Sequence, residues 1–182
     1  MAAALRGGCR WLSLREKDLG HEERLALLHR IVALARPFGA TISVHGDLEA
    51  AAATGVGVHL PTGASPEQAR ARLGEGALIG LSVHSPREAA TAHPAADYVT
   101  LSPIFPSISK PGYGPALGTQ GLAEAVAGAR VPPIVALGGV TADNLAQCLA
   151  SGAAAVAVMG AVMAAADPEA ATAALVQALA GF

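Results

Sequence analysis

Short apolar runs alternate along the whole chain with longer runs rich in Ala, Leu and Arg that have helical periodicity. Most of the short runs are almost continuously apolar, which is typical of strands buried on both faces of a parallel sheet. Strict alternation of such strands with helices predicts right-handed crossovers and a parallel α/β fold. We expect strands at 9–14, 41–44, 56–60, 78–83, 98–104, 133–137 and 155–159.

The runs between these strands predict helices with recognisable ends. Ser65 and Ser85 each precede a proline, which places a capping side chain directly before the first helical residue. Asp167 stands in the same position before the last helix, and Gly55 lies where a preceding helix should stop. We expect helices at 22–36, 48–54, 65–73, 86–93, 119–129, 142–151 and 168–180.

Two architectures fit this alternation, an open doubly wound sheet and a closed (β/α)8 barrel. No G-x-G-x-x-G turn follows the first strand, which weakens the nucleotide-binding alternative. Glycines follow the last two strands, at Gly138, Gly139 and Gly160, where barrels form phosphate sites. We therefore predict one (β/α)8 TIM-barrel domain over 1–182. Because seven strands are predicted and not eight, we expect this chain to lack the first strand of the barrel.

Composition and charge narrow the classes of partner. The 182 residues are 52% hydrophobic and 14% charged with a net charge of −2, which excludes a disordered chain. The sequence has no cluster of Lys and Arg of the kind that binds nucleic acid or an anionic membrane surface. The apolar runs are too short to cross a bilayer, and the N-terminus lacks a signal-peptide pattern. Cys9 and Cys148 are expected to be buried thiols. We expect a cytoplasmic protein and leave a homo-oligomer open.

Function in a barrel is located at the carboxyl ends of the strands. The first predicted strand ends before Arg15 and Lys17, two cations suited to an anionic substrate. His45 and His84 follow two other strands and are candidates for general acid/base catalysis. Ser82 shares one face of its strand with His84 and is a further candidate ligand.

Other polar residues near these ends are interpreted as structural. Asp47 stands where it would cap the helix at 48–54. His59 lies one residue before the end of its strand and is assigned no catalytic role. Among carboxylates only Glu16 and Asp47 lie near the strand ends, so no metal site is predicted.

The connection at 102–118 is long for a loop between a strand and a helix. Long ordered loops in compact domains tend to be functional. Ser107, Ser109 and Lys110 supply hydroxyl and ammonium donors suited to a phosphate or pyrophosphate. The three glycines after the last two strands would add backbone N–H groups for a phosphate. A small-molecule phosphate is therefore the expected substrate.

Six motifs in this chain follow an order that resembles the thiamine phosphate synthase/TenI family. They are SLREK at 13–17, GVHLP at 57–61, GLSVHS at 80–85, SPIFPSISK at 102–110, PIVALGG at 133–139 and AVAVMG at 155–160. The resemblance implies a (β/α)8 barrel that acts on a thiazole phosphate in thiamin biosynthesis. It also implies one of two activities. The synthase couples a pyrimidine pyrophosphate to the thiazole phosphate using Mg²⁺, and the tautomerase, TenI, moves a proton on a thiazole carboxylate phosphate without a metal.

The chain departs from both patterns. Synthases carry Asn-Asp where this chain has HG at 45–46, and Gly-Gln-x-Asp where it has PTGA at 61–64. Both metal-binding carboxylates are therefore absent, and the chain looks closer to TenI at these positions. Pro103 stands where TenI has its proposed catalytic His, so His45 or His84 would have to move the proton. The serines and lysine of the long loop instead resemble the pyrophosphate loop of synthases.

We therefore expect a thiazole tautomerase-like isomerase that binds a thiazole phosphate and needs no cofactor. One alternative is a divergent thiamine-phosphate synthase, a transferase that would use Mg²⁺. The other is a non-catalytic binder of thiazole or thiamin phosphate.

Overall fold

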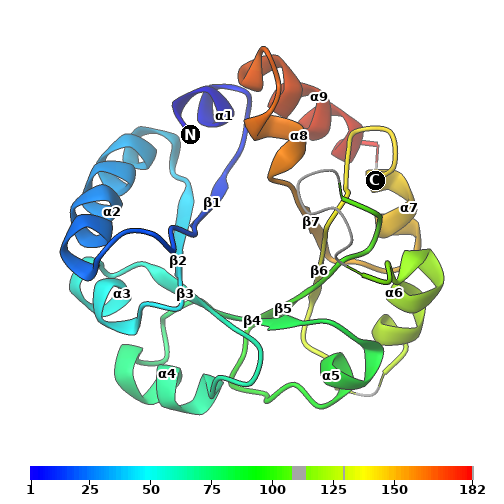
Figure 1. Ribbon diagram of the computed structural model, residues 1–182, viewed down its shortest axis with the longest axis horizontal. Helices are drawn as coiled ribbons and strands as arrows, with labels where there is room; N and C mark the ends of the chain where they lie inside the picture. Colours follow the sequence, from blue (N-terminus) through cyan, green and yellow to red (C-terminus); the bar gives the residue numbers. More distant parts are fainter. Residues whose placement is uncertain (108–113, 129, 182) are drawn as a thin grey trace.

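The computed structural model describes residues 1–107, 114–128 and 130–181 and shows a curled parallel sheet surrounded by helices (Figure 1). Its seven strands are hydrogen-bonded in the order of the sequence, from β1 to β7. This order excludes a doubly wound sheet, in which the strand order reverses. The strands are β1 (Trp11–Leu14), β2 (Thr41–His45), β3 (Gly57–Leu60), β4 (Ile79–Val83), β5 (Tyr98–Leu101), β6 (Ile134–Leu137) and β7 (Ala155–Ala157).

Helices cover the convex face of the sheet, and the short apolar runs were correctly predicted as the strands beneath them. The helices are α1 (Ala2–Arg6), α2 (His21–Ala35), the 3-10 turn η1 (Arg36–Phe38), α3 (Leu48–Thr54), α4 (Pro66–Leu73), α5 (Pro86–Ala90), α6 (Gly118–Val126), α7 (Leu145–Ala150), α8 (Gly160–Met163) and α9 (Pro168–Leu179).

Several predicted boundaries are wrong for local reasons. The strand expected at 98–104 ends at Leu101, because Pro103 has no N–H to give to a sheet ladder. The helix expected at 142–151 begins only at Leu145, since the Thr141 amide donates to Asn144 Oδ1 at 2.8 Å and forms a turn first. The short helix α8 was not predicted. Cys148 is buried as expected, whereas Cys9 is partly exposed.

The register of the strands sorts side chains by face. Leu14 lies beside Val44, and Val44 beside Val58 and then Ile79. These outward residues are almost fully buried under the helices. Residues between them point toward the concave face. Burial of an outward apolar side chain stabilises the fold by about 1.5–3 kcal/mol relative to exposure, so this pattern fixes which side chains remain for the interior.

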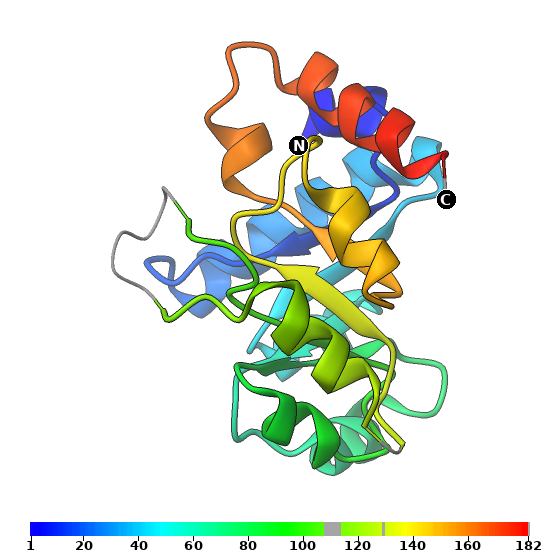
Figure 2. The same cartoon turned by 90° about the vertical axis from the view of Figure 1, so that its right-hand side faces the viewer.

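The sheet is curled, but β1 and β7 do not pair with each other in the described part of the chain. The ring of helices continues across this opening, where α1 packs against α9 (Figure 2). The observed fold is thus a seven-stranded parallel sheet of the barrel type. None of its described helices is long and apolar enough to cross a membrane.

Asp47 joins the end of β2 to two helices, as its predicted role as a cap requires. Its Oδ1 accepts from the Ala50 amide at 2.9 Å and caps α3, while its Oδ2 accepts from Arg24 Nη1 at 2.5 Å and lies 3.2 Å from His21 Nδ1. Burial alone would raise the pKa of this carboxyl. The bonds from Ala50, Arg24 and His21 outweigh burial and hold its pKa below the ordinary value.

Replacing Asp47 therefore tests how α2 and α3 are attached to the sheet. Asp47→Ala should lower the free energy of unfolding by about 2–4 kcal/mol, because it removes a helix cap and leaves the partly buried charge of Arg24 without its carboxylate partner. Since the folded pKa is lowered, the stabilising effect of Asp47 is present above the unfolded pKa and is lost as the pH falls through the folded one. Urea unfolding as a function of pH measures both effects. Glu49→Ala, which removes an exposed pairing with Arg72, should change stability little.

Candidate active site

Polar side chains gather on the concave face of the sheet, in contrast to its apolar outer face. One row runs across four strands, where His45 lies beside His59, His59 beside Gly80, and Gly80 beside Tyr98. The row begins at Tyr98, the first residue of β5, and ends at His45, the last residue of β2. It therefore crosses the concave face obliquely, and its His45 end lies at the carboxyl ends of the strands, where barrels place their active sites.

His59 is the centre of a hydrogen-bonded cluster. Its Nδ1 lies 2.9 Å from the Tyr98 hydroxyl, and its Nε2 lies 2.9 Å from Ser82 Oγ and 3.1 Å from Thr100 Oγ1. A neutral imidazole has one donor and one acceptor nitrogen, and hydroxyl groups can turn to match either arrangement. The cluster therefore joins β3, β4 and β5 through one imidazole that can exist in either tautomer.

The two imidazoles of this row stay uncharged at neutral pH. Their rings stack with centroids 5.3 Å apart. Burial, with help from the charges of Arg15 and Lys17, lowers the pKa of His45 to about 4. Burial also lowers the pKa of His59 to about 4, with smaller effects from His45 and Arg15. Neutral imidazoles can accept or relay a proton, so the row is suited to acid/base chemistry.

Tyr98 meets a residue from the far side of the curled sheet. Its ring packs edge-on against Trp11 of β1, with centroids 4.7 Å apart, although β1 and β5 are not neighbours. Burial raises the pKa of Tyr98 to about 12, so its hydroxyl stays protonated. The buried Ser43 hydroxyl lies near enough to oppose this rise, yet it makes no well-formed hydrogen bond within the described residues. Trp11 and Tyr98 are the first residues of β1 and β5, so this aromatic pair lies at the amino ends of the strands, away from His45.

Gly80 is required for this packing. A Cβ atom at this position would lie 2.1 Å from the Tyr98 ring and 2.5 Å from His59 Nδ1. Both distances are far below van der Waals contact. The hydrogen bond between His59 and Tyr98 can therefore form only because this strand residue has no side chain.

The structure places the predicted cations and histidines at the same end of the sheet. Arg15 and Lys17 directly follow β1, and both lie close enough to His45, at the end of the neighbouring β2, for their charges to lower its pKa. His84 follows β4, and its Nδ1 lies 2.8 Å from the Ser102 carbonyl oxygen. Since a carbonyl oxygen only accepts, Nδ1 of His84 carries a hydrogen and donates to it.

Only some of the predicted phosphate-binding residues lie in the described part of the chain. Gly138 and Gly139 follow β6, and Gly160 begins α8 after β7. A Cβ atom on Gly139 would lie 2.7 Å from Phe105 and 2.5 Å from the Pro106 carbonyl oxygen, so this glycine allows the long loop to pack close. Ser107 lies in the described part of that loop and is partly buried, whereas Ser109 and Lys110 lie outside the described residues. The phosphate-binding role of all these residues stays a prediction.

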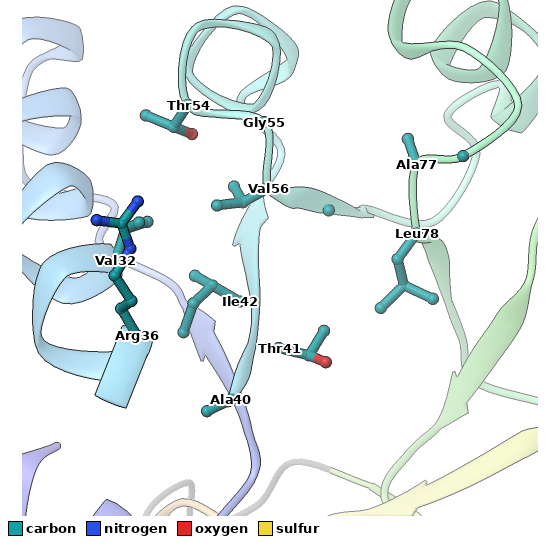
Figure 3. Close-up of a pocket in the computed structure, with 12 residues that line it drawn as sticks. Val32, Arg36, Ala40, Thr41, Ile42, Thr54, Gly55, Val56, Ala77 and Leu78 are labelled. Carbon is teal, nitrogen blue, oxygen red and sulfur yellow. The ribbon is translucent and has the colours of Figure 1, made fainter. Parts of the chain in front are cut away.

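A groove lies at the amino ends of the strands, at the opposite end of the sheet from His45. It has a volume of about 420 Å³ and runs between α2, α3, the first residues of β2 and β3, and the segment at 76–78 that leads into β4 (Figure 3). Its lining is apolar or backbone except for Thr41, Thr54 and the guanidinium of Arg36. It contains no histidine or carboxylate, so it offers no side chain suited to acid/base catalysis.

Sequence reasoning missed the residues at the centre of the site. His59 was interpreted as structural because its strand is apolar on both sides and alternation alone did not show which face was inside. Tyr98 and Thr100 were not selected because they lie inside a predicted strand and not at its end. One signal could have found them: polar residues recur at every second position in β2, β4 and β5, as in Ser43 and His45.

A parallel barrel-type sheet with its polar groups at the carboxyl ends of the strands defines a class of enzymes that carry their chemistry at that end. Residues 1–162 match the family described as thiamine monophosphate synthase. The chain is 40% identical over 163 residues to a thiamine-phosphate synthase of Methanoregula boonei, which covers 88% of this chain and 75% of the relative. It is 36% identical over 178 residues to one of Roseiflexus sp., covering 96% and 75%.

Solved structures agree with the sequence comparison. A thiamine phosphate pyrophosphorylase from Pyrococcus furiosus superimposes with a TM-score of 0.87 at 30% identity, covering 99% of this chain and 87% of the other. The chain therefore belongs to the thiamine monophosphate synthase family, an enzyme family of thiamin biosynthesis. The predicted family and the barrel-type fold are confirmed. The relatives are named synthases, so the closer likeness to TenI stays a prediction.

Substitution of Gly80 tests the packing of the row. Gly80→Ala should destabilise the protein by about 1–3 kcal/mol through overpacking, and it should separate His59 from Tyr98. Trp11 is the only tryptophan, so its fluorescence reports the shifted tyrosine. Gly76→Ala is the matched control, because a Cβ there meets no atom within 4 Å. Equal stability of the two variants would contradict the described packing.

The lowered histidine pKa values predict a pH dependence of stability. Between about pH 4 and 6.5, the unfolded chain binds more protons at His45 and His59 than the folded chain does. The free energy of unfolding should therefore be unaffected by these two histidines above pH 6.5, and it should decrease as the pH falls from 6.5 toward 4. Imidazole NMR should show both rings uncharged at neutral pH. A midpoint near 6.5 for either ring would contradict its burial beside cationic groups.

Proposed function

We propose that the chain catalyses the synthase reaction after which its relatives are named, joining a pyrimidine pyrophosphate to a thiazole phosphate. The overall similarity supports this reaction over the isomerase expected from local motifs, since relatives at 36–40% identity over most of the chain carry the synthase name. The observation that carries the proposal is the position of Arg15 and Lys17 beside the carboxyl end of β2, where an anionic leaving group needs positive charge.

In this reaction the nitrogen of the thiazole ring forms a bond to the methylene carbon of the pyrimidine. The bond from that carbon to the pyrophosphate oxygen breaks, and pyrophosphate leaves with the electron pair. No proton is transferred at carbon. Arg15 and Lys17 would stabilise the charge on the leaving oxygen. The imidazoles of His45 and His59 would face the thiazole and pyrimidine rings. Because both imidazoles are neutral, they would not repel the positively charged product.

One specific observation favours a second candidate, the tautomerase reaction. His45, whose pKa is lowered to about 4 by burial, and His84 both lie at the carboxyl ends, where an imidazole could take a proton from a thiazole carboxylate phosphate and return it. This reaction would use the same cations to hold the carboxylate or phosphate.

Paired assays separate these functions. Incubation with thiazole phosphate and the pyrimidine pyrophosphate should yield thiamin phosphate and pyrophosphate, measured by chromatography. Arg15→Gln should lower kcat/KM by about 10²–10³-fold, because it removes charge stabilisation of the leaving group. Arg30→Gln, an exposed cation on α2, should leave the rate unchanged.

Two other outcomes of these assays would contradict the synthase reaction. Isomerisation of the thiazole carboxylate phosphate without coupling, abolished in His45→Ala or His84→Ala, would replace the synthase with the tautomerase. Tight binding of thiazole phosphate with no turnover of either kind would support a non-catalytic binder.

A further inference from the structure

The loop that joins β1 to α2 carries charges of alternating sign. Arg15 and Lys17 are each followed by a carboxylate, Glu16 and Asp18, and all four residues are exposed. Both cations lie close enough to His45 for their charges to lower its pKa. A shift of this loop by one residue would put a carboxylate where a cation stands. The placement of the loop therefore decides which sign of charge faces the end of β2.

The backbone of this loop does not fix that placement by itself. None of residues 15–19 forms a backbone–backbone hydrogen bond with another described residue. The loop is held instead by the side chain of Arg24, in the first turn of α2. Its Nε donates to the Glu16 carbonyl oxygen at 3.2 Å, and its Nη2 donates to the Leu19 carbonyl oxygen at 2.7 Å. One guanidinium thus holds both ends of the charged segment.

The remaining nitrogen of this guanidinium attaches the loop to the sheet. Nη1 donates to Asp47 Oδ2 at 2.5 Å, and Asp47 follows closely after His45, the last residue of β2. The side chains of Arg24 and Asp47 are only 19% and 8% exposed. Since the donors of a guanidinium lie in one rigid plane, its contact with Asp47 also fixes where the two carbonyl groups of the loop can lie. Arg24 therefore sets the place of the loop relative to the end of β2.

We propose that Arg24 is a positioning residue, which holds the loop so that Arg15 and Lys17 face the carboxyl end of β2. This inference rests on the proposed function for the role of the two cations. Each nitrogen of Arg24 already donates to the protein, so Arg24 acts through the loop and not on the substrate. Because a displacement of about 1 Å in an active site can cost about 10²-fold in rate, a loosened loop should slow the reaction.

Steady-state kinetics of Arg24 variants test this role. Arg24→Gln should lower kcat/KM by about tenfold or more, and it should raise the KM for the pyrimidine pyrophosphate but not the KM for thiazole phosphate. Arg24→Lys can keep the ion pair with Asp47, but its single nitrogen cannot replace three donors in one plane. It should therefore recover thermal stability without recovering that KM. A lower kcat with both KM values unchanged is the result of losing folded enzyme, and it would overturn the inference.

A double-mutant cycle shows whether Arg24 acts through Arg15. Arg15→Gln should cost at least about tenfold less in kcat/KM in the Arg24→Gln background than in the unaltered protein, because residues that act through one another are not additive. Arg70 is the matched control, since it donates to the Ala77 carbonyl oxygen at 2.7 Å and pairs with Asp97 while only 14% exposed. In the Arg70→Gln background, Arg15→Gln should keep its full cost. Full additivity of the Arg24 and Arg15 variants would contradict the inference.

Trypsin gives a measurement that needs no substrate. At a temperature where every variant is folded, cleavage after Arg15 and Lys17 should be about tenfold faster in Arg24→Gln than in the unaltered protein, because two hydrogen bonds that hold the loop are lost. Arg70→Gln should not change it. Unchanged cleavage in Arg24→Gln would overturn the inference whatever the activity. Faster cleavage in a protein that forms no thiamin phosphate would contradict the proposed function and still support the attachment of the loop by Arg24.

Discussion

The hydrogen-bonded register of the parallel strands is the constraint on which the site depends. It aligns Val44, Val58 and Ile79 on the outer face, where the helices bury them, and it aligns His45 and His59 on the inner face. A shift of one residue in any strand would exchange the two sets and bury histidines under the helices. The apolar outer face therefore stabilises the fold and, by the same pairing, positions the polar row. In this protein the stability of the sheet and the geometry of the site have one origin.

The sequence predicts the outer half of this arrangement well and the inner half poorly. Apolar runs and caps such as Asp47 carry local signals, and the strands, most helices and the barrel-type order agree with the structure. The cluster around His59 depends on contacts between residues 23 to 41 positions apart, from His59 to Ser82, Tyr98 and Thr100. No local pattern encodes those contacts. Gly80 likewise resembles any strand glycine until Tyr98 and His59 are placed against it.

Similarity over the whole chain identifies the family, whereas the residues at the strand ends bear on how the reaction is carried out. Similarity over most of the chain establishes the family and favours the synthase reaction. The residues at the ends of β2 and β3 decide how that reaction could be carried out, because HG at 45–46 and PTGA at 61–64 provide no carboxylate for a metal. Arg15 and Lys17 supply positive charge at the same end of the sheet.

We infer that substrate binds on the concave face, at the carboxyl ends of the strands. A crystal structure of the protein with thiazole phosphate bound would locate the ligand. We expect it at that end, with its ring near His45 and His59. A ligand bound instead in the groove beside Arg36, at the opposite end of the sheet, would contradict it (Figure 3).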